Sequence, residues 1–579
     1  MQFSSLTNQN PWLITLSGFV LALTLALTLA LFGWFSPGLT LCAAVFLFGG
    51  IGLSLVVLYQ KHDRLRLILI GVLTLGAIFI AIRTEPTVFT GRDQGSIALA
   101  SLELAAQHEL AFRTPVSDAF FAVYGPGRAL NFPGFSYTDT GALITQFPLG
   151  YIAYLGIFTS WFGPTGLLIA NALLFILSGW TFFELLTLFV SRRNALLGTI
   201  LFATSFIIVW LTQITLTENL ALFLFLSLVV ALVYFHQDND AHFLPALLVT
   251  GFLLALTRIE GFVIAPLALA YILYRPTLRN HLLRLPKKWT VPTLLFLSFL
   301  FLRDFFMNLP FYTTLGKAAL KYWHTLSAGT SAGTEPNLGP ILISYGLFPL
   351  FVLGIAALIF EVMQRRTRLI IPILLAAPTL IYLLNGHISD DHPWLLRRYA
   401  FTLFPLFLLA TVVLWDSLET KLGDGQKKLF AAVCFSFLFI FQIPPSFQAL
   451  KTVEYQTLYE QTLSLGQQFG DRDLILIDRG STGDPFAMIT GPLATLDGKN
   501  AVYFFNPEDY SRIDRHAFEH TYLLTTAESL SRYAEVFDTR LIPRDVISFS
   551  SPTLIVPSAF AWPETSIVKS DALLFEVTP

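Results

Sequence analysis

The chain has 579 residues, of which 54% are hydrophobic and only 13% charged, and its formal net charge is -2. Because soluble domains average about 25% charged residues, this composition excludes an ordinary soluble protein and predicts a polytopic membrane protein. The near-neutral charge does not favour nucleic acid as a partner.

Apolar runs of membrane-spanning length begin close to the N-terminus. A helix needs about 20 apolar residues to cross a hydrocarbon core of ~30 Å. The first run, residues 12–34, lacks the basic start and cleavage site of a signal peptide, so we expect it to be retained. Further spans are predicted at residues 39–60, 67–82, 167–190, 195–211, 220–236, 243–256, 262–274, 291–302, 341–360, 369–384, 399–415 and 429–443.

The basic loops predict the orientation, because Lys and Arg in short loops stay on the cytoplasmic side. Five basic segments decide it, namely residues 61–66, 192–193, 275–288, 364–368 and 421–428. With these segments inside, the N-terminus is inside, the C-terminal tail is outside, and about thirteen spans result. Residues 147–162 are apolar and aromatic but would reverse every later loop if they crossed, so we interpret them as interfacial.

Residues 243–274 allow two interpretations. They form either two short spans that meet at an outer corner, or one long helix with Arg258 and Glu260 buried midway. A single crossing would place the basic segment 275–288 outside, so the two-span interpretation is favoured.

Three long outer loops follow from this topology, at residues 83–146, 303–340 and 385–398. The first is too long to be idle in a compact bundle. Within it, residues 96–108 suit a helix lying on the membrane surface. We expect the three loops to shape one pocket.

The composition changes after Pro444 and Pro445, where charges appear every few residues. Apolar strands at 473–478, 501–505 and 521–525 alternate with candidate helices at 484–493 and 527–537, which predicts a soluble α/β domain. The turn at 480–483 lacks the Lys and the spacing of a phosphate-binding P-loop. The predicted organisation is two N-terminal spans (1–66), a membrane module (67–445) and an extracytoplasmic domain (446–579).

Three charged fragments lie at the ends of apolar segments: Gly-Arg-Asp-Gln-Gly at 91–95, Thr-Glu-Asn at 217–219 and Thr-Arg-Ile-Glu-Gly at 257–261. The predicted topology places all three on the same side of the membrane. An ionisable group costs at least ~2.5 kcal/mol at the centre of a membrane helix, so charges gathered at one face indicate a functional site.

The order and sidedness of these fragments resemble the GT-C superfamily of membrane glycosyltransferases, especially its protein-mannosyltransferase and aminoarabinose-transferase branch. Asp93 opens the first outer loop, where the family keeps an acidic residue, and Glu218 falls where it has an outer-facing acid. Residues 147–163 are similar to its Pro-Leu-x-Tyr juxtamembrane segment ending in Phe-Gly, and 257–261 to its Arg-x-Glu-Gly corner. The chain departs from the family in having Gln94 after Asp93, in its two spans before the catalytic-loop span, and in its tail domain.

This resemblance implies an inverting transfer of one sugar from a polyprenyl-phosphate donor to a hydroxyl on a glycan, lipid or protein, outside the cytoplasm at the plasma (inner) membrane. Asp93 would be the catalytic base. The substrate-binding residues implied are Arg92, Glu218, Arg258, Glu260, Arg397 and Arg398, with the arginines suited to phosphate and the acids to orienting them or the sugar.

Each role has a plainer alternative. Asp93 would cap a helix, Glu218 would sit in a helix's first turn, Arg258 and Glu260 would close a corner as an ion pair, and the two later arginines would anchor a span at the interface.

No cofactor is predicted, and a divalent metal is not favoured, because His324, His387 and His392 lack ligand spacing. The main rival function is a transporter or flippase for lipid-linked saccharides. Transporters place ionisable residues near the midplane between repeated halves, whereas here the charges lie at one face and no repeat is visible. A catalytically silent scaffold is the third alternative.

Overall fold

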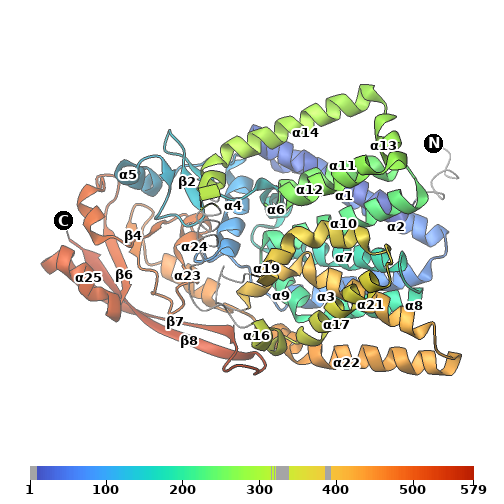
Figure 1. The fold of residues 1–579 in the computed structure, drawn as a ribbon. Coiled ribbons are helices and arrows are strands. Elements are labelled where there is room, and N and C mark those ends of the chain that lie inside the picture. Colours follow the sequence, from blue (N-terminus) through green and yellow to red (C-terminus); the bar gives the residue numbers. More distant parts are fainter. Residues whose placement is uncertain (1–9, 315, 318–319, 321–337, 385–392, 579) are drawn as a thin grey trace.

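The computed structural model describes residues 10–314, 316–317, 320, 338–384 and 393–578. A bundle of helices fills one side of the molecule and a C-terminal domain with a sheet fills the other (Figure 1). In the described part, seven helices are long and apolar enough to cross a membrane, or up to eleven if each bent helix pair is one span. The chain is therefore an integral membrane protein with a C-terminal α/β domain, as predicted, whereas the count of thirteen spans is not confirmed.

The N-terminal helices pack as a close pair followed by a third helix. They are α1 (Pro11–Phe32), α2 (Pro37–Gln60) and α3 (Arg64–Ala81). The side chain of Asn10 accepts the Trp12 backbone N–H at 3.0 Å and so caps the first turn of α1. A Cβ on Gly18 would lie 2.6 Å from the Phe46 carbonyl oxygen of α2, so glycine allows the two backbones to touch.

The first outer loop is folded rather than extended. It contains α4 (Asp93–Gln107), α5 (Pro115–Tyr124), β1 (Gly127–Arg128), β2 (Phe135–Tyr137), β3 (Leu143–Thr145) and then α6 (Leu149–Phe162). The three short strands form an antiparallel sheet. With 14 residues, α6 is only about 21 Å long, too short to cross a bilayer.

The expectation that α4 lies on the membrane surface is wrong. Its residues 94–104 are all buried, because α6 packs on one side and a helix of the C-terminal domain, α24 (Thr490–Thr495), on the other. A Cβ on Gly491 would lie 2.3 Å from the Leu99 side chain, which shows how closely the two segments approach. The alternation of apolar and polar positions indicated one exposed face, but Ser96 and Ser101 on that face are buried, and their hydroxyls donate to the Pro133 and Ala98 carbonyls.

The centre of the bundle follows in chain order. Its helices are α7 (Thr165–Thr187), α8 (Arg192–Thr204), α9 (Phe206–Gln213), α10 (Thr217–Asp238), α11 (Phe243–Ala255), α12 (Gly261–Tyr274), α13 (Pro276–Leu283) and α14 (Lys287–Met307). Helix α10 is the core, since every residue from Thr217 to Val233 is buried. The predicted span 195–211 is broken at Ser205, where α8 and α9 meet at 51°.

Residues 243–274 form two helices, as predicted. Helices α11 and α12 contact each other, and a Cβ on Gly251 would lie 3.4 Å from the Cβ of Ala265. At the corner, a Cβ on Gly261 would lie 2.5 Å from the Leu254 carbonyl oxygen. The corner therefore requires glycine at this position, which explains the end of the Arg-Ile-Glu-Gly fragment.

The last membrane helices are α16 (Leu338–Ser344), α17 (Phe348–Met363), α18 (Ile370–Ala376), α19 (Ile381–Leu384), α20 (Arg397–Ala400), α21 (Leu403–Glu419) and α22 (Asp424–Lys451), with short 3-10 turns η2 (Ala377–Leu380) and η3 (Trp394–Leu396). The predicted domain boundary after Pro445 does not coincide with a helix end, because α22 continues to Lys451. Pro445 cannot donate to the Phe441 carbonyl. The backbone of Gly346, with φ of +69°, approaches that carbonyl instead, so a neighbouring loop covers the site of the missing bond.

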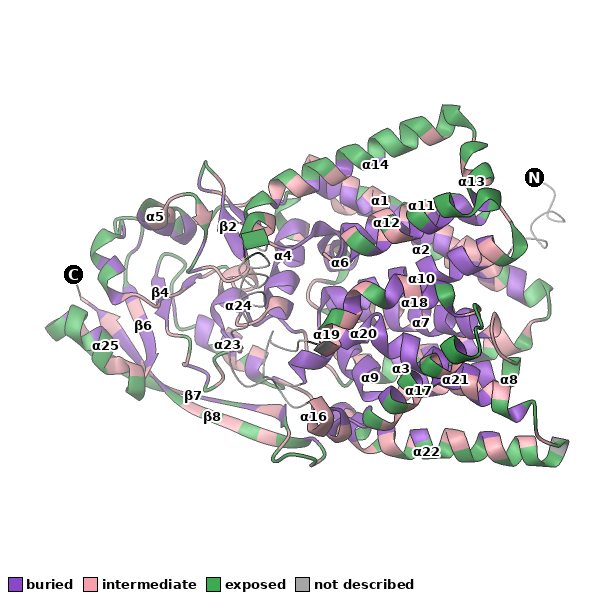
Figure 2. Ribbon diagram, in the orientation of Figure 1, coloured by how far each residue is buried: buried purple, intermediate pink, exposed green. Residues whose placement is uncertain are grey.

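The basic segments gather at the end of the bundle away from the C-terminal domain, where Figure 1 shows α13 and the start of α22. Ion pairs join them to the helix ends there: Arg66 to Glu184 at 2.6 Å, Arg193 to Glu419 at 3.3 Å and Arg368 to Glu361 at 2.6 Å. Along the sides, α14 and α22 are largely exposed while α7 and α10 are buried (Figure 2). Exposed Leu295 and Ile440 show that these outer surfaces are apolar, as a lipid-facing surface is.

The C-terminal domain has a five-stranded mixed sheet in the order β5-β4-β6-β8-β7. Its elements are α23 (Leu458–Gly466), β4 (Leu474–Ile477), α24, β5 (Asn500–Tyr503), η4 (Pro507–Arg512), β6 (Thr521–Thr526), α25 (Ala527–Phe537), η5 (Asp538–Arg540), β7 (Leu541–Ile555) and β8 (Glu564–Val577). The three predicted strands are present, with β4 parallel to both neighbours, and so is the helix at 527–537. The antiparallel hairpin β7–β8 was not predicted. Most of β7 and the first half of β8 are exposed or half-buried, and only the end of β8, from Ala572 to Val577, carries a buried apolar run.

Candidate functional site

Asp93 lies at the start of α4 and pairs with Arg397, which begins α20. The Arg397 Nη1 is 2.6 Å from the Asp93 Oδ2, and the Asp93 side chain is 42% exposed while that of Arg397 is 11% exposed. The N-cap of α4 is Arg92, so Asp93 is not the capping residue. A Cβ on Gly95 would lie 1.7 Å from the Phe89 carbonyl oxygen, so only glycine lets the chain turn into α4 this tightly.

Arg258 occupies the centre of a buried cluster of acids. Its Nε and Nη2 donate to Oε2 and Oε1 of Glu260 at 3.0 and 2.6 Å, the two-point geometry that suits a guanidinium and a carboxylate. Its Nη1 lies 2.6 Å from Oε1 of Glu218, which is completely buried in the first turn of α10. The same Nη1 donates to the Thr217 hydroxyl at 3.3 Å. Both plainer alternatives, a first-turn acid and a corner ion pair, are thus present within the cluster.

Arg397 joins the exposed acid to the buried cluster. Its Nε is 3.8 Å from Glu218 Oε1, while its Nη1 holds Asp93. The charges therefore alternate along a continuous path from Asp93 through Arg397, Glu218 and Arg258 to Glu260.

The two remaining arginines, Arg92 and Arg398, lie against aromatic rings near the two ends of this path. The Arg92 guanidinium lies 4.8 Å from the ring centroid of Trp394, which Arg397 also contacts at 4.3 Å. Arg398 lies 5.6 Å from the ring centroid of Tyr382, whose hydroxyl donates to Glu260 at 2.7 Å. The structure thus brings together all seven residues that the sequence singled out, from four separate parts of the chain.

The buried corner carboxyl of Glu260 is held in its charged form. Burial alone would raise its pKa, but the attraction and hydrogen bonds of Arg258, with the hydroxyl of Tyr382, outweigh burial and hold the pKa of Glu260 well below its ordinary value. Glu260 and Arg258 therefore form a charged pair at neutral pH.

The C-terminal domain completes the surroundings of Asp93. A cavity of about 270 Å³ is lined by Arg92 and Asp93 together with Arg479 and Tyr503 of that domain. A second cavity, of about 450 Å³, has Arg92 and Trp394 in its lining. Sequence reasoning missed these contributions because they come from contacts between distant segments.

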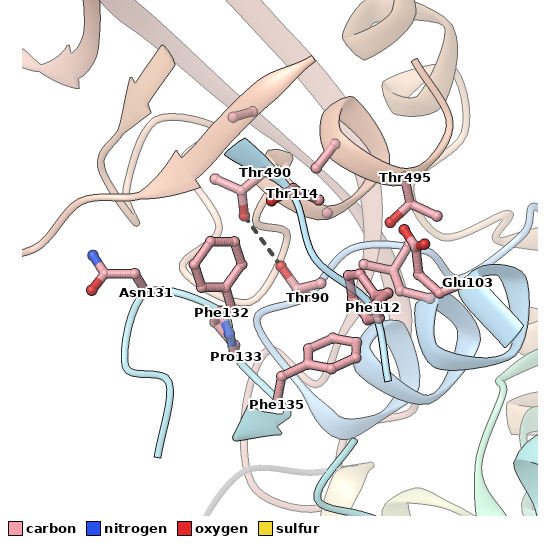
Figure 3. A pocket seen from close by; sticks show the side chains of 14 residues that line it. Thr90, Glu103, Phe112, Thr114, Asn131, Phe132, Pro133, Phe135, Thr490 and Thr495 are labelled. Atoms are coloured by element: carbon pink, nitrogen blue, oxygen red, sulfur yellow. Dashed lines mark hydrogen bonds between the residues drawn. The ribbon is translucent and has the colours of Figure 1, made fainter. Parts of the chain in front are cut away.

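The first outer loop and the C-terminal domain are joined by backbone as well as side chains. The Thr90 N–H donates to the Met488 carbonyl at 3.2 Å, and the Thr90 and Thr490 hydroxyls are 3.4 Å apart (Figure 3). In the same figure Glu103 lies beside Thr495, and burial raises the pKa of Glu103. The domain is thus packed directly onto the segment that carries Asp93.

A Gly91→Ala variant tests this packing, because a Cβ there would lie 2.3 Å from the Phe486 backbone. We expect the overlap to displace the loop that carries Asp93, and to lower any activity at least tenfold and the unfolding temperature measurably. Gly49→Ala on α2 is the control, since a Cβ there meets nothing within 4 Å. Equal behaviour of the two variants in thermal unfolding and in activity would contradict the close docking.

In the described part of the chain, no group of three or more His, Cys, Asp or Glu side chains is placed to hold a metal ion. His324, His387 and His392, the histidines considered from the sequence, lie outside the described residues.

No protein-family model matches the sequence, and no curated protein matches it. Among solved structures, the chain is similar to ArnT from Cupriavidus metallidurans in the apo state, with 11% identity, a TM-score of 0.48, and coverage of 89% of this chain and 99% of ArnT. The chain is also similar to ArnT from Cupriavidus metallidurans bound to undecaprenyl phosphate, with 10% identity, a TM-score of 0.47, and coverage of 89% of this chain and 99% of ArnT. A third similar structure is the archaeal oligosaccharyltransferase AglB from Archaeoglobus fulgidus, in complex with an inhibitory peptide and a dolichol-phosphate. Its identity is 13% and its TM-score 0.46, and the match covers 82% of this chain and 71% of AglB.

Identities this low and TM-scores of this size assign no activity, ligand or residue role to this chain.

Proposed function

We propose that this protein is a glycosyltransferase that moves a sugar from a polyprenyl-phosphate donor to an acceptor hydroxyl. The main support for this proposal is the position of Asp93. Its side chain is half-exposed beside a cavity and lies close to guanidinium groups that suit a phosphate. A base for the acceptor and cations for the leaving phosphate are the two requirements of this reaction.

In the proposed reaction, the acceptor hydroxyl attacks the anomeric carbon while its proton passes to Asp93. The bond from that carbon to the phosphate oxygen breaks, and the electron pair leaves on the polyprenyl phosphate. A single displacement of this kind inverts the anomeric configuration. No residue forms a covalent intermediate.

The arginines have unequal roles in this proposal. Arg258 is held by two carboxylates, so it positions Glu218 rather than binding phosphate. Arg397 contacts Asp93 and Glu218 through one nitrogen each, and Arg398 makes no two-point pairing with a carboxylate among the described residues. These two arginines are the groups assigned to the donor phosphate. Their guanidinium charge would stabilise the phosphate as the sugar leaves.

An apolar groove supports a donor with a hydrocarbon tail. A cavity of about 330 Å³ opens between α3, the break of α8 and α9, and the end of α22, with apolar residues making up most of its lining. Val209 of α9 lines this groove, and the next residue, Trp210, lines the cavity that contains Arg92 and Trp394. We assign the groove to the isoprenoid chain.

An Ala203→Trp variant should fill this groove, which Ala203 lines. The expected result is at least a tenfold rise in KM for the lipid donor with little change in kcat, measured with donors of long and short isoprenoid chains. Ala270→Trp, on the exposed surface of α12, is the matched control. An unchanged donor KM for Ala203→Trp would remove the groove from the proposal.

The positive-inside rule supports an extracytoplasmic site, and we propose that the membrane is the plasma (inner) membrane. The basic segments lie at the opposite end of the bundle from Asp93 and the C-terminal domain. In this proposal the C-terminal domain and the acceptor meet outside the cytoplasm.

The test is a transfer assay with purified protein and a panel of labelled polyprenyl-phosphate sugars, in which released polyprenyl phosphate and labelled product are measured. A glycosyltransferase releases the lipid phosphate in step with product. A flippase moves labelled lipid between the leaflets of a vesicle without cleaving it, and that result would replace the proposal with the rival function.

A further inference from the structure

The cavity beside Asp93 is shared between the first outer loop and the C-terminal domain. It has a volume of about 270 Å³, close to the lower end of the ~300–1,000 Å³ usual for ligand pockets, which suits a single substituted sugar. Much of its lining is polar, and includes Ser96, Gln146 and Tyr503.

Positive charge predominates in this cavity. Its lining holds three guanidinium groups, from Arg92, Arg128 and Arg479, and one carboxylate, from Asp93. That carboxylate is already paired with Arg397, which lies outside the lining. Among the lining residues, Arg128 and Arg479 therefore contribute two positive charges that the one lining carboxylate does not pair.

Phe486 fixes two of these arginines. The guanidinium of Arg92 lies 3.9 Å from its ring centroid and that of Arg479 lies 5.4 Å from it, both favourable cation–π arrangements. The Arg479 Nε also donates to the Pro485 carbonyl at 2.9 Å. The Phe486 N–H in turn donates to Asp484 Oδ1 at 2.8 Å, so the loop that carries the ring is itself held.

We propose that this cavity binds the acceptor, and that the acceptor is a saccharide with an anionic group, a phosphate or a carboxylate, next to the hydroxyl that receives the sugar. This inference rests on the proposed function, whose acceptor it specifies. Arg128 and Arg479 bind the anionic group, since a guanidinium fork matches the oxygens of either anion. The neighbouring hydroxyl then faces Asp93, which takes its proton in the transfer step described above.

Equilibrium binding to the purified full-length protein tests the cavity without any donor. The probes are glucose 6-phosphate, glucuronic acid and glucose, and the binding of each is measured by isothermal titration calorimetry. We expect at least one of the two anionic sugars to bind tenfold or more tightly than glucose. We also expect the double variant Arg128→Gln/Arg479→Gln to remove that preference.

Matched controls come from the same two segments. Arg113 of the outer loop and Arg472 of the C-terminal domain are exposed arginines outside the cavity lining, and they pair with Asp118 and Glu519. Arg113→Gln/Arg472→Gln should leave the preference intact. The variant Arg128→Lys/Arg479→Lys, which keeps both charges, should retain part of it. Equal binding of glucose and both anions by the wild type, or an unchanged preference in the Arg128→Gln/Arg479→Gln variant, would overturn the inference.

Turnover separates this inference from the proposed function. With a working donor, the Arg128→Gln/Arg479→Gln variant should show at least a tenfold higher KM for the anionic acceptor and an unchanged KM for the donor. A wild type that cleaves no polyprenyl-phosphate sugar would refute the proposed function, while the binding experiment would still decide whether the cavity selects anions. Transfer to neutral acceptors with the same kcat/KM as to anionic ones would overturn the inference and leave the proposed function standing.

Discussion

Replacing Asp93 by asparagine is expected to lower the rate of sugar transfer by about 10²- to 10⁴-fold, the usual contribution of a positioned general base. Asparagine has the same shape and can occupy the start of α4, but it cannot accept the acceptor's proton. The kcat should fall while the KM for the donor changes little, because the donor is assigned to other groups. Steady-state release of polyprenyl phosphate measures both.

Asp118→Asn is the control for this variant. Asp118 also lies in the first turn of an outer-loop helix, α5, and faces an arginine, with 3.6 Å between Arg113 Nη1 and Asp118 Oδ1. The turnover of Asp118→Asn should stay within about twofold of the wild-type value, since an acid in the first turn contributes only ~0.3–1 kcal/mol to helix stability. If Asp93→Asn behaved like Asp118→Asn, Asp93 would be a structural acid and not the base.

The second large effect is expected on stability, from Arg258→Met. The substitution leaves the carboxylate of Glu260 buried without its cation, and leaves that of Glu218 with only the longer 3.8 Å contact to Arg397. Removing one partner of a buried ion pair typically costs about 3–5 kcal/mol, so the variant should unfold at much lower temperature or denaturant concentration. Unfolding of the purified protein in detergent, followed by the fluorescence of its tryptophans, measures the change.

Two comparisons make this result specific. Arg113→Met removes an exposed ion pair and should cost no more than ~1 kcal/mol. Adding Glu218→Gln and Glu260→Gln to Arg258→Met should recover part of the lost stability, because no unpaired carboxylate is left in the interior. No recovery in the triple variant would mean that Arg258 acts through packing, including its contact with Phe401, rather than through charge.

Local patterns in the sequence predicted most of the long helices and singled out seven residues that lie together in the structure. Apolar periodicity located the long helices, and the cost of burying charge made Glu218, Arg258 and Glu260 conspicuous at helix ends. The basic loops resolved the corner at 257–261, which the structure forms with two helices that meet at Gly261. The roles of the seven residues in catalysis and binding remain predictions.

The contacts of the C-terminal domain could not be predicted in this way. Phe486 and Arg479 have no local pattern that marks them, and they reach the site only because the domain packs on Gly91 and Thr90. The same packing buries α4, whose sequence suits a half-exposed helix. Trp394 gave a weak signal, an aromatic residue shortly before the arginine pair, but its stacking with both Arg92 and Arg397 depends on the fold.

The most direct test of the account is an experimental structure of the protein in a lipid nanodisc with a polyprenyl phosphate bound, determined by electron cryo-microscopy. The account predicts phosphate oxygens within about 2.7–2.9 Å of the guanidinium of Arg397 or Arg398, with Asp93 facing the adjoining cavity. A phosphate bound elsewhere, above all beside the basic segments at the opposite end of the bundle, would contradict it.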